Sequence, residues 1–292
     1  MRTQREIRRE SYFHTAIVKR YLERNTQGSE KHNEELKELL GTYGSFEAAY
    51  EGLQRRERRS TEKMDEVVKR LGKCEFGMIT INEEEFPEKL KGEGLTPVIY
   101  YQGDLGLLSN PGMAVVGTRE LSDEVDRREG KRITERWIDE GRVIVSGLAL
   151  GCDTLAHETA LEYNGGTIAV LGTAIDKTYP KATDNNSLQK RIIERGLVIS
   201  EYPIGSEDQR AWWKGGGQFA NRNRTTVGLA DIGITVIRAG DKSGTQHAIK
   251  AAIGTGKKVY ILENNQGKGY KWIERITKKS PLLVEIIWRE DG

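Results

Sequence analysis

Short apolar runs alternate with helix-like stretches from residue 113 onward, and this alternation limits the possible fold more than any other feature of the sequence. The runs are continuous and do not alternate polar with apolar residues, which is typical of strands covered on both faces. They lie at Met113–Val116, Val143–Val145, Thr167–Leu171, Leu197–Ser200, Ile232–Ile237 and Lys258–Leu262. Helices are predicted between them at about Ser122–Glu140, Asp153–Tyr163, Ser187–Glu194, Asn223–Ala230 and Gly244–Gly254. This order predicts an α/β fold, a doubly wound Rossmann-like domain with a parallel sheet and right-handed crossovers.

The N-terminal part of the chain has a helical pattern instead. A helix is predicted over Arg5–Asn25, and short helices are expected between residues 34 and 71. The Ser45 hydroxyl can cap the segment Phe46–Gly52 by accepting a hydrogen bond from its first turn. Within Thr61–Leu71, apolar residues recur at the spacing of one helix face.

These patterns divide the chain into three parts. Residues 1–75 are expected to form a small helical region, and residues 76–112 a connecting segment with strands at Gly77–Thr80 and Val98–Tyr101. Residues 113–292 are expected to form the Rossmann-like domain, with a final strand inside Leu282–Trp288.

Composition restricts the class of protein. The chain has no apolar run of about 18 residues, so no membrane span is expected. The N-terminus lacks the apolar core of a secretion signal and the 2 cysteines indicate no disulfide framework, so we expect a cytoplasmic protein. The net charge of +2 does not indicate nucleic acid by itself, so a nucleic-acid site would need a local concentration of Lys and Arg.

Ligands of open α/β sheets bind beyond the carboxyl ends of the strands, so the loops after the strands are the candidate sites. Gly117, Thr118 and Arg119 follow the first strand. Glycine permits close approach of a ligand to the main chain, threonine supplies a hydroxyl, and the guanidinium fork of arginine pairs with phosphate. The helix that begins near Ser122 would direct its positive end to the same place.

The loop after the second strand, residues 146–153, predicts a phosphate site without the signature of a nucleotide enzyme. Neither the glycine spacing of a dinucleotide fingerprint nor the Gly-Lys-Ser/Thr of a P-loop is present. We interpret Asp153 as a helix N-cap and His157 as a packed, hydrogen-bonded residue rather than a catalyst. The residues that would let the main chain wrap an anion are Ser146, Gly147, Ala149 and Gly151.

The segment Phe219–Arg224 is the most distinctive of the sequence. It places Phe219 three residues before an Arg-x-Arg pair, Arg222 and Arg224, which flank Asn223 at the predicted start of a helix. Bases stack on aromatic rings and guanidinium groups hold phosphates, so this pattern suits single-stranded nucleic acid. A buried Phe219 with ion-paired arginines fits the pattern equally well, and both interpretations stay open.

Taken together, these loops resemble the DprA/Smf family of DNA-processing proteins. The resemblance runs from about residue 36 to 262 and is densest between 113 and 230. It is carried by Val115-Val116-Gly117-Thr118-Arg119, Val145-Ser146-Gly147-Leu148-Ala149-Leu150-Gly151-Cys152-Asp153, Ala156-His157, Gly166-Thr167-Ile168-Ala169-Val170-Leu171-Gly172, Tyr179-Pro180, Ser200-Glu201-Tyr202-Pro203, Phe219-x-x-Arg222-Asn223-Arg224 and Ser243-Gly244-Thr245.

The resemblance implies a helical SAM-like domain before the Rossmann-like domain, binding and protection of single-stranded DNA, loading of a RecA-type recombinase, and a homodimer. It implies no cofactor, no metal and no catalytic residue. The positions it places at or near the DNA groove are Arg119, Ser146, Gly147, Phe219, Arg222 and Arg224, and Ser243 falls in the family's later Ser-Gly element. The chain departs from the family at Cys152, where isoleucine is common, at Trp212–Gly217, where a proline-rich loop is common, and in having too few residues after the sheet for a winged helix.

Two other functions remain possible. The stretch Asp241–Ala248 corresponds to the signature of LOG-type nucleoside-monophosphate phosphoribohydrolases, but Gln246, His247 and Ala248 do not supply the carboxylates that would stabilise a cationic sugar. A nucleotide sensor could use the same phosphate loops. A sensor would be stabilised thermally by a mononucleotide, and a DNA-binding protein mainly by oligonucleotides.

Overall fold

The computed structural model describes residues 2–22, 28–56, 64–178, 183–206 and 217–287. The chain divides into two compact units. Unit 1 consists of Met1–Gln102, Leu171–Lys177 and Ile199–Asn221, and unit 2 of Gly103–Val170, Thr178–Val198 and Arg222–Gly292.

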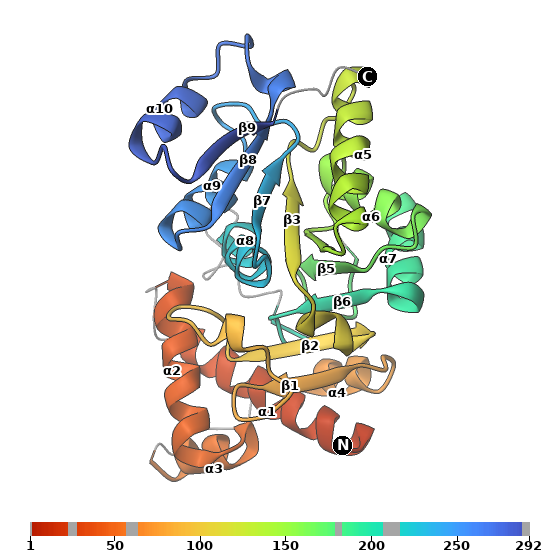
Figure 1. Ribbon diagram of the computed structural model, residues 1–292. Helices are drawn as coiled ribbons and strands as arrows, with labels where there is room; N and C mark the ends of the chain where they lie inside the picture. Colours follow the sequence, from red (N-terminus) through yellow and green to blue (C-terminus); the bar gives the residue numbers. More distant parts are fainter. Residues whose placement is uncertain (1, 23–27, 57–63, 179–182, 207–216, 288–292) are drawn as a thin grey trace. The chain divides into compact units, whose positions relative to one another are not determined.

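Unit 1 is built mainly from N-terminal helices and an antiparallel strand pair (Figure 1). The cap predicted at Ser45 is confirmed, since its Oγ accepts from Ala48 N at 3.1 Å. His14 stacks on Phe46 with ring centroids 4.3 Å apart, and its Nδ1 lies 2.7 Å from the Tyr100 hydroxyl, in the core of this unit. The elements are α1 (Gln4–Leu22), α2 (Gly28–Tyr43), α3 (Phe46–Arg56), α4 (Asp65–Leu71), β1 (Gly77–Thr80), the 3-10 turn η1 (Glu88–Leu90) and β2 (Val98–Gly103).

Unit 2 contains a parallel sheet in which six strands are neighbours in the order β5-β4-β3-β7-β8-β9. The sheet runs through the centre of this unit in Figure 1. Its strands and 3-10 turns are η2 (Leu105–Ser109), β3 (Gly112–Val116), β4 (Val143–Ser146), β5 (Thr167–Leu171), β7 (Gly233–Val236), β8 (Lys258–Leu262), η3 (Glu263–Asn265) and β9 (Val284–Ile287), and β6 (Leu197–Ser200) crosses the division between the units.

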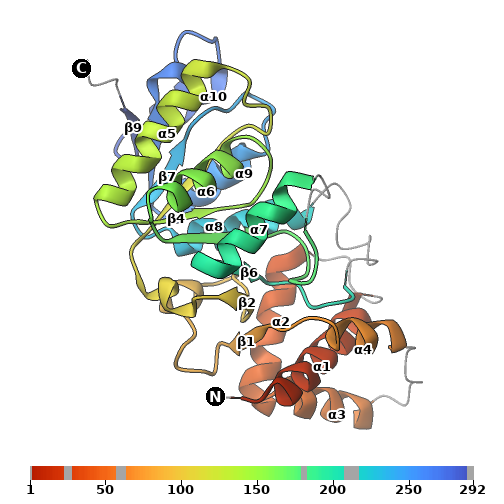
Figure 2. The same cartoon turned by 90° about the vertical axis from the view of Figure 1, so that its right-hand side faces the viewer.

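Helices cover both faces of this sheet (Figures 1 and 2). Successive side chains of a strand point to opposite faces, so each strand packs against helices on both sides. In β3, Met113 and Val115 pack toward α5 and α6, whereas Ala114 and Val116 pack toward α8, α9 and α10. The predicted doubly wound α/β fold is therefore confirmed. The helices are α5 (Glu124–Asp139), α6 (Cys152–Glu162), α7 (Thr183–Arg195), α8 (Gly217–Leu229), α9 (Thr245–Gly254) and α10 (Lys271–Lys279).

Several elements differ from the sequence prediction. Helix α8 begins at Gly217, six residues before the predicted start at Asn223, α7 begins four residues before the predicted start at Ser187, and α10 lies in a region for which no helix was predicted. In the described residues, no helix has the length and apolarity needed to cross a membrane. The segment Trp212–Gly216 and the Tyr179-Pro180 pair lie outside the described residues.

Candidate functional site

The loops after β3, β4 and β7 lie at the same edge of the unit 2 sheet, because these strands are parallel neighbours. This edge carries most of the residues that the sequence indicated. The structure shows two clusters there, one around residues 117–119 and one around residues 146–151.

The main chain of residues 117–119 is held by three other segments of unit 2. Thr118 N donates to the carbonyl of Arg238 at 2.8 Å, and the Thr118 carbonyl accepts from Cys152 N at 3.1 Å. The Thr245 Oγ1 donates to the carbonyl of Gly117 at 3.0 Å. From this fixed base the Arg119 side chain projects as an exposed residue.

Gly117 serves packing within the chain rather than the approach of a ligand. A Cβ at this position would overlap the Sγ of Cys152 and lie 2.9 Å from the Arg238 carbonyl. Gly151 is restricted in a similar way: its φ is +77°, and a Cβ there would lie 2.6 Å from the carbonyl oxygen of Arg119. The loops after β3 and β4 thus contact each other main chain to main chain.

The loop after β4 surrounds a carboxyl group of the chain itself, that of Asp153. The Asp153 carboxylate accepts from Ala149 N at 3.2 Å and from the N–H of Gly147. Burial raises the pKa of Asp153 above its ordinary value, while Arg222 and these N–H groups lower it. The predicted role of Asp153 as the cap of α6 is wrong, since Gly151 is the N-cap residue.

Ser146 and Arg222 are buried beneath this loop. Ser146 Oγ donates to the Val115 carbonyl at 2.6 Å. Arg222 is only 5% exposed, its Nη1 donates to the Val170 carbonyl at 2.9 Å, and a Cβ on Gly147 would overlap its guanidinium. The sequence left open whether Arg222 holds phosphate or forms an ion pair, and the structure places its guanidinium inside unit 2.

Phe219, Asn223 and Arg224 are half-buried on α8. Because α8 begins at Gly217, the expectation that the positive end of this helix lies at Asn223 is wrong. Phe219 belongs to unit 1, where its ring covers Gly172 so closely that a Cβ on that glycine would lie 2.6 Å from Phe219 Cδ1.

Ser243 lies just before α9 and forms hydrogen bonds with Thr245, the first residue of that helix. Its Oγ accepts from Thr245 N at 3.2 Å and donates to Thr245 Oγ1 at 2.9 Å. Because Thr245 in turn donates to Gly117, the Ser-Gly-Thr element is connected to the loop that carries Arg119.

His157 is fully buried, which confirms its interpretation as a packed residue. Its Nδ1 lies 2.7 Å from Thr167 Oγ1, and that hydroxyl donates to the Ile144 carbonyl at 3.2 Å. The hydroxyl hydrogen is thus used, so Nδ1 must carry the proton that it donates to Oγ1. Burial, and to a lesser extent Arg222, lowers the pKa of His157 to about 3, so the imidazole is neutral.

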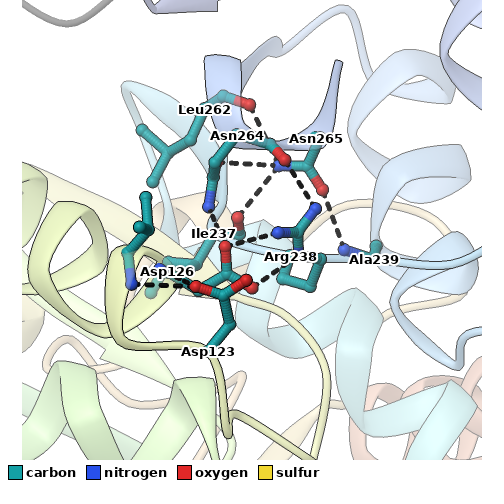
Figure 3. Close-up of polar contacts among 9 residues, drawn as sticks. Asp123, Asp126, Ile237, Arg238, Ala239, Leu262, Asn264 and Asn265 are labelled. Carbon is teal, nitrogen blue, oxygen red and sulfur yellow. Dashed lines mark hydrogen bonds and ion pairs between the residues drawn. The ribbon is translucent and has the colours of Figure 1, made fainter. Parts of the chain in front are cut away.

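Sequence reasoning missed a buried charge network beside residues 117–119 (Figure 3). Arg238 pairs with Asp126 of α5, and Asn264 and Asn265 complete the network. A signal existed: Arg238 immediately follows a buried strand, where a charged side chain requires a partner.

The chain is similar to several known proteins. A family model described as DNA recombination-mediator protein A matches residues 77–277. Protein Smf of Synechocystis sp. is 39% identical over 173 residues, which are 58% of this chain and 41% of that protein. DNA processing protein DprA of Streptococcus pneumoniae is 37% identical over 191 residues, 64% of this chain and 63% of the relative. The chain therefore spans less than two thirds of the length of either relative.

Two solved structures share the fold. The X-ray structure of DprA from Streptococcus pneumoniae aligns with a TM-score of 0.65 and 29% identity, covering 83% of this chain and 77% of that one. DNA processing protein A from Helicobacter pylori, whose structure is described as giving insight into a single-stranded DNA binding mode, aligns with a TM-score of 0.58 and 26% identity. That alignment covers 73% of this chain and 91% of the other.

Proposed function

The chain belongs to the DNA recombination-mediator protein A family, the DprA/Smf family that its motifs resemble, and we propose that it binds single-stranded DNA at the carboxyl edge of the unit 2 sheet. The single-stranded DNA binding mode described for the Helicobacter pylori protein supports this proposal.

One observation carries the proposal: Arg119 is exposed, while the main chain on which it stands is tied to α6, β7 and α9. The tied main chain fixes the point from which the Arg119 side chain projects, and its guanidinium can make paired hydrogen bonds to phosphate. Arg119 is therefore assigned the central phosphate contact.

The N–H groups of Gly147 and Ala149 have a different role in this proposal from the one the motif suggests. They hold the Asp153 carboxylate, and Ser146 and Arg222 are buried beneath them. We assign these residues to the shape of the site. Phe219 is assigned to stacking with a base, and Asn223 and Arg224, half-buried on α8, to contacts with the strand.

The absence of covalent chemistry is part of the proposal. Three titratable groups next to the loops are held in unreactive forms: burial raises the pKa of the Cys152 thiol, Asp153 is hydrogen-bonded, and His157 is neutral and buried. Incubation with adenosine or cytidine monophosphate should release no free base. Release that persists through repurification and disappears on substitution within residues 146–153 would support the phosphoribohydrolase alternative.

The finer family role is proposed from resemblance: protection of single-stranded DNA, loading of a RecA-type recombinase, a homodimer and a cytosolic location. Co-purification with a recombinase and sedimentation at two protein concentrations would test the recombinase contact and the dimer respectively.

The decisive experiment compares a single-stranded oligonucleotide with the corresponding duplex at two salt concentrations. We expect tighter binding of the single strand, with each neutralised phosphate adding about 0.7 to the negative log–log salt slope. Equal affinity for the two forms contradicts the proposal. Thermal stabilisation by a mononucleotide but not by oligonucleotides would favour the sensor alternative instead.

A further inference from the structure

Three N–H groups of the Arg238 side chain donate within a network inside unit 2 (Figure 3). Its Nε and Nη2 donate to the two carboxylate oxygens of Asp126 at 2.6 and 2.5 Å, and its Nη1 donates to the Asn264 carbonyl at 2.6 Å. The side chains of the pair are 9% and 5% exposed. Arg238 is therefore paired with a carboxylate inside the chain, and we assign it no contact with phosphate.

Two asparagines of η3 extend the network to the ends of neighbouring strands. Asn264 Nδ2 donates to Asp126 Oδ1 at 2.6 Å. Asn265 accepts from Ala239 N at 3.1 Å through its Oδ1 and donates to the Ile237 carbonyl at 2.9 Å through its Nδ2. The ends of β7 and β8 and the first turn of α5 are thus joined by side chains as well as by packing.

The same residue also holds the loop that carries Arg119. The main-chain carbonyl of Arg238 accepts from Thr118 N at 2.8 Å, while its guanidinium binds Asp126. Arg238 therefore contacts both ends of the segment 118–126, with one atom group on each side of Arg119. Within the segment, Asp123 Oδ1 accepts from Val125 N at 2.8 Å and starts α5.

We propose that the Arg238–Asp126 pair is a positioning device for DNA binding, which closes the segment 118–126 and thereby sets the direction in which Arg119 projects. This inference rests on the proposed function of Arg119. Neither Arg238 nor Asp126 contacts the DNA in this proposal, and their effect on affinity passes entirely through Arg119.

A buried ion pair such as Arg238–Asp126 contributes little net stability, so stabilisation alone does not explain its presence. The desolvation of two buried charges offsets much of their attraction, so apolar residues of similar volume often stabilise a protein as well. What an apolar pair lacks is the fixed angle between a guanidinium fork and a carboxylate. That angle sets the orientation of α5, and with it the loop that leads into α5.

The test is a double-mutant cycle between Asp126→Asn and Arg119→Ala, read as affinity for a single-stranded oligonucleotide well below the melting temperature of every variant. We expect about a tenfold loss for each single substitution. In the Arg119→Ala background, Asp126→Asn should cost less than about twofold more, because the side chain that it positions is already absent. Arg238→Lys keeps the positive charge but loses the paired hydrogen bonds of the guanidinium, so it should reduce the affinity as Asp126→Asn does. It replaces Asp126→Asn in the cycle if that variant does not fold.

Thr235→Val is the matched control. Trp137 of α5 donates its Nε1 to Thr235 Oγ1 of β7 at 2.9 Å, so this substitution removes another buried contact between the same two elements, away from the loop. It should lower the melting temperature and leave the affinity for DNA unchanged.

The outcomes separate the two proposals. If the parent binds single-stranded DNA and Asp126→Asn binds equally well, or if its loss adds in full to that of Arg119→Ala, the positioning role is wrong. A loss of affinity in Thr235→Val equal to that of Asp126→Asn would reduce the pair to a general stabiliser and also overturn it. If the parent does not bind single-stranded DNA, the proposed function fails instead.

Discussion

Gly151→Ala is the substitution whose effect the structure defines most closely. Gly151 has φ of +77°, and a Cβ built on it would lie 2.6 Å from the carbonyl oxygen of Arg119, closer than real Cβ atoms come to such an atom. The obstructing atom belongs to main chain, so the clash cannot be relieved by rotation of a side chain. The loop of residues 117–119 must move, or Gly151 must move away from it.

Gly141→Ala provides the matched control. Gly141 has nearly the same φ, +74°, but nothing lies within 4 Å of its added Cβ. The positive φ costs alanine about 1–2 kcal/mol at Gly141 and at least as much at Gly151, whose ψ of −119° lies outside the left-handed helical region, and reduced freedom of the unfolded chain returns about 0.4–1 kcal/mol. Overpacking adds about 1–3 kcal/mol at Gly151 alone. We therefore expect a net loss of folding free energy of about 1 kcal/mol for Gly141→Ala and about 2–4 kcal/mol for Gly151→Ala.

Both variants should remain folded, because domains of this kind have about 5–15 kcal/mol of stability. Urea titration measures the stability, and fluorescence anisotropy with a labelled single-stranded oligonucleotide measures binding by the folded protein. Gly151→Ala should bind at least about tenfold more weakly, the loss expected when one charge-assisted contact is displaced, while Gly141→Ala should bind like the parent. Equal DNA affinities in the two variants would refute the reasoning that the loops after β3 and β4 hold each other in place.

Substitutions at three residues test other parts of the site. Arg119→Ala should remove a charge-assisted contact of about 1.5–3 kcal/mol and weaken binding at least tenfold; a collapse of the melting temperature with normal binding per folded molecule would make Arg119 structural. Phe219→Ala should bind several-fold more weakly and melt a few degrees lower, because its ring also covers Gly172, whereas Phe219→Trp should retain binding in the same anisotropy assay. Burial lowers the pKa of His157 to about 3. Below about pH 6.5 the unfolded chain therefore takes up a proton that the folded chain does not, and the free energy of unfolding decreases as the pH is lowered. Urea titrations should therefore show a loss between about pH 7.5 and pH 5 that is about 2 kcal/mol smaller in His157→Gln than in the parent.

The elements of this fold were predictable where a single local pattern defines them. The strands Thr167–Leu171, Leu197–Ser200 and Lys258–Leu262 have the predicted bounds, because a short apolar run between polar turns permits few other structures. The start of α8 was mistaken because the prediction relied on Asn223 and Arg224 as first-turn residues, although nothing in the helix pattern excludes an earlier start at Gly217.

The side chains of the site were less predictable than its location. The rule that ligands bind beyond the carboxyl ends of parallel strands placed Arg119, Gly151 and Ser243 at one edge correctly. It could not indicate that Arg222 is buried, because that depends on the packing of α8 against residues distant in sequence, the Val170 carbonyl and Gly147. The Arg238–Asp126 pair joins residues 112 positions apart, so the signal at Arg238, a charge beside a buried strand, could not identify its partner.

The glycines at this edge change what we expect of the proposed interaction with DNA. They were interpreted as places where phosphate approaches the main chain, but Gly117 makes room for Cys152, Gly147 for Arg222 and Gly151 for the loop of residues 117–119. The N–H groups of the loop after β4 already bind the carboxyl group of Asp153, so a phosphate would have to displace a group that is covalently part of the chain. Binding must then rely on side chains such as Arg119 that project from this packed base, and not on a cradle of main-chain N–H groups. A site of that kind makes few phosphate contacts, so its salt dependence should be shallow, and most of that dependence should disappear with the single substitution Arg119→Ala.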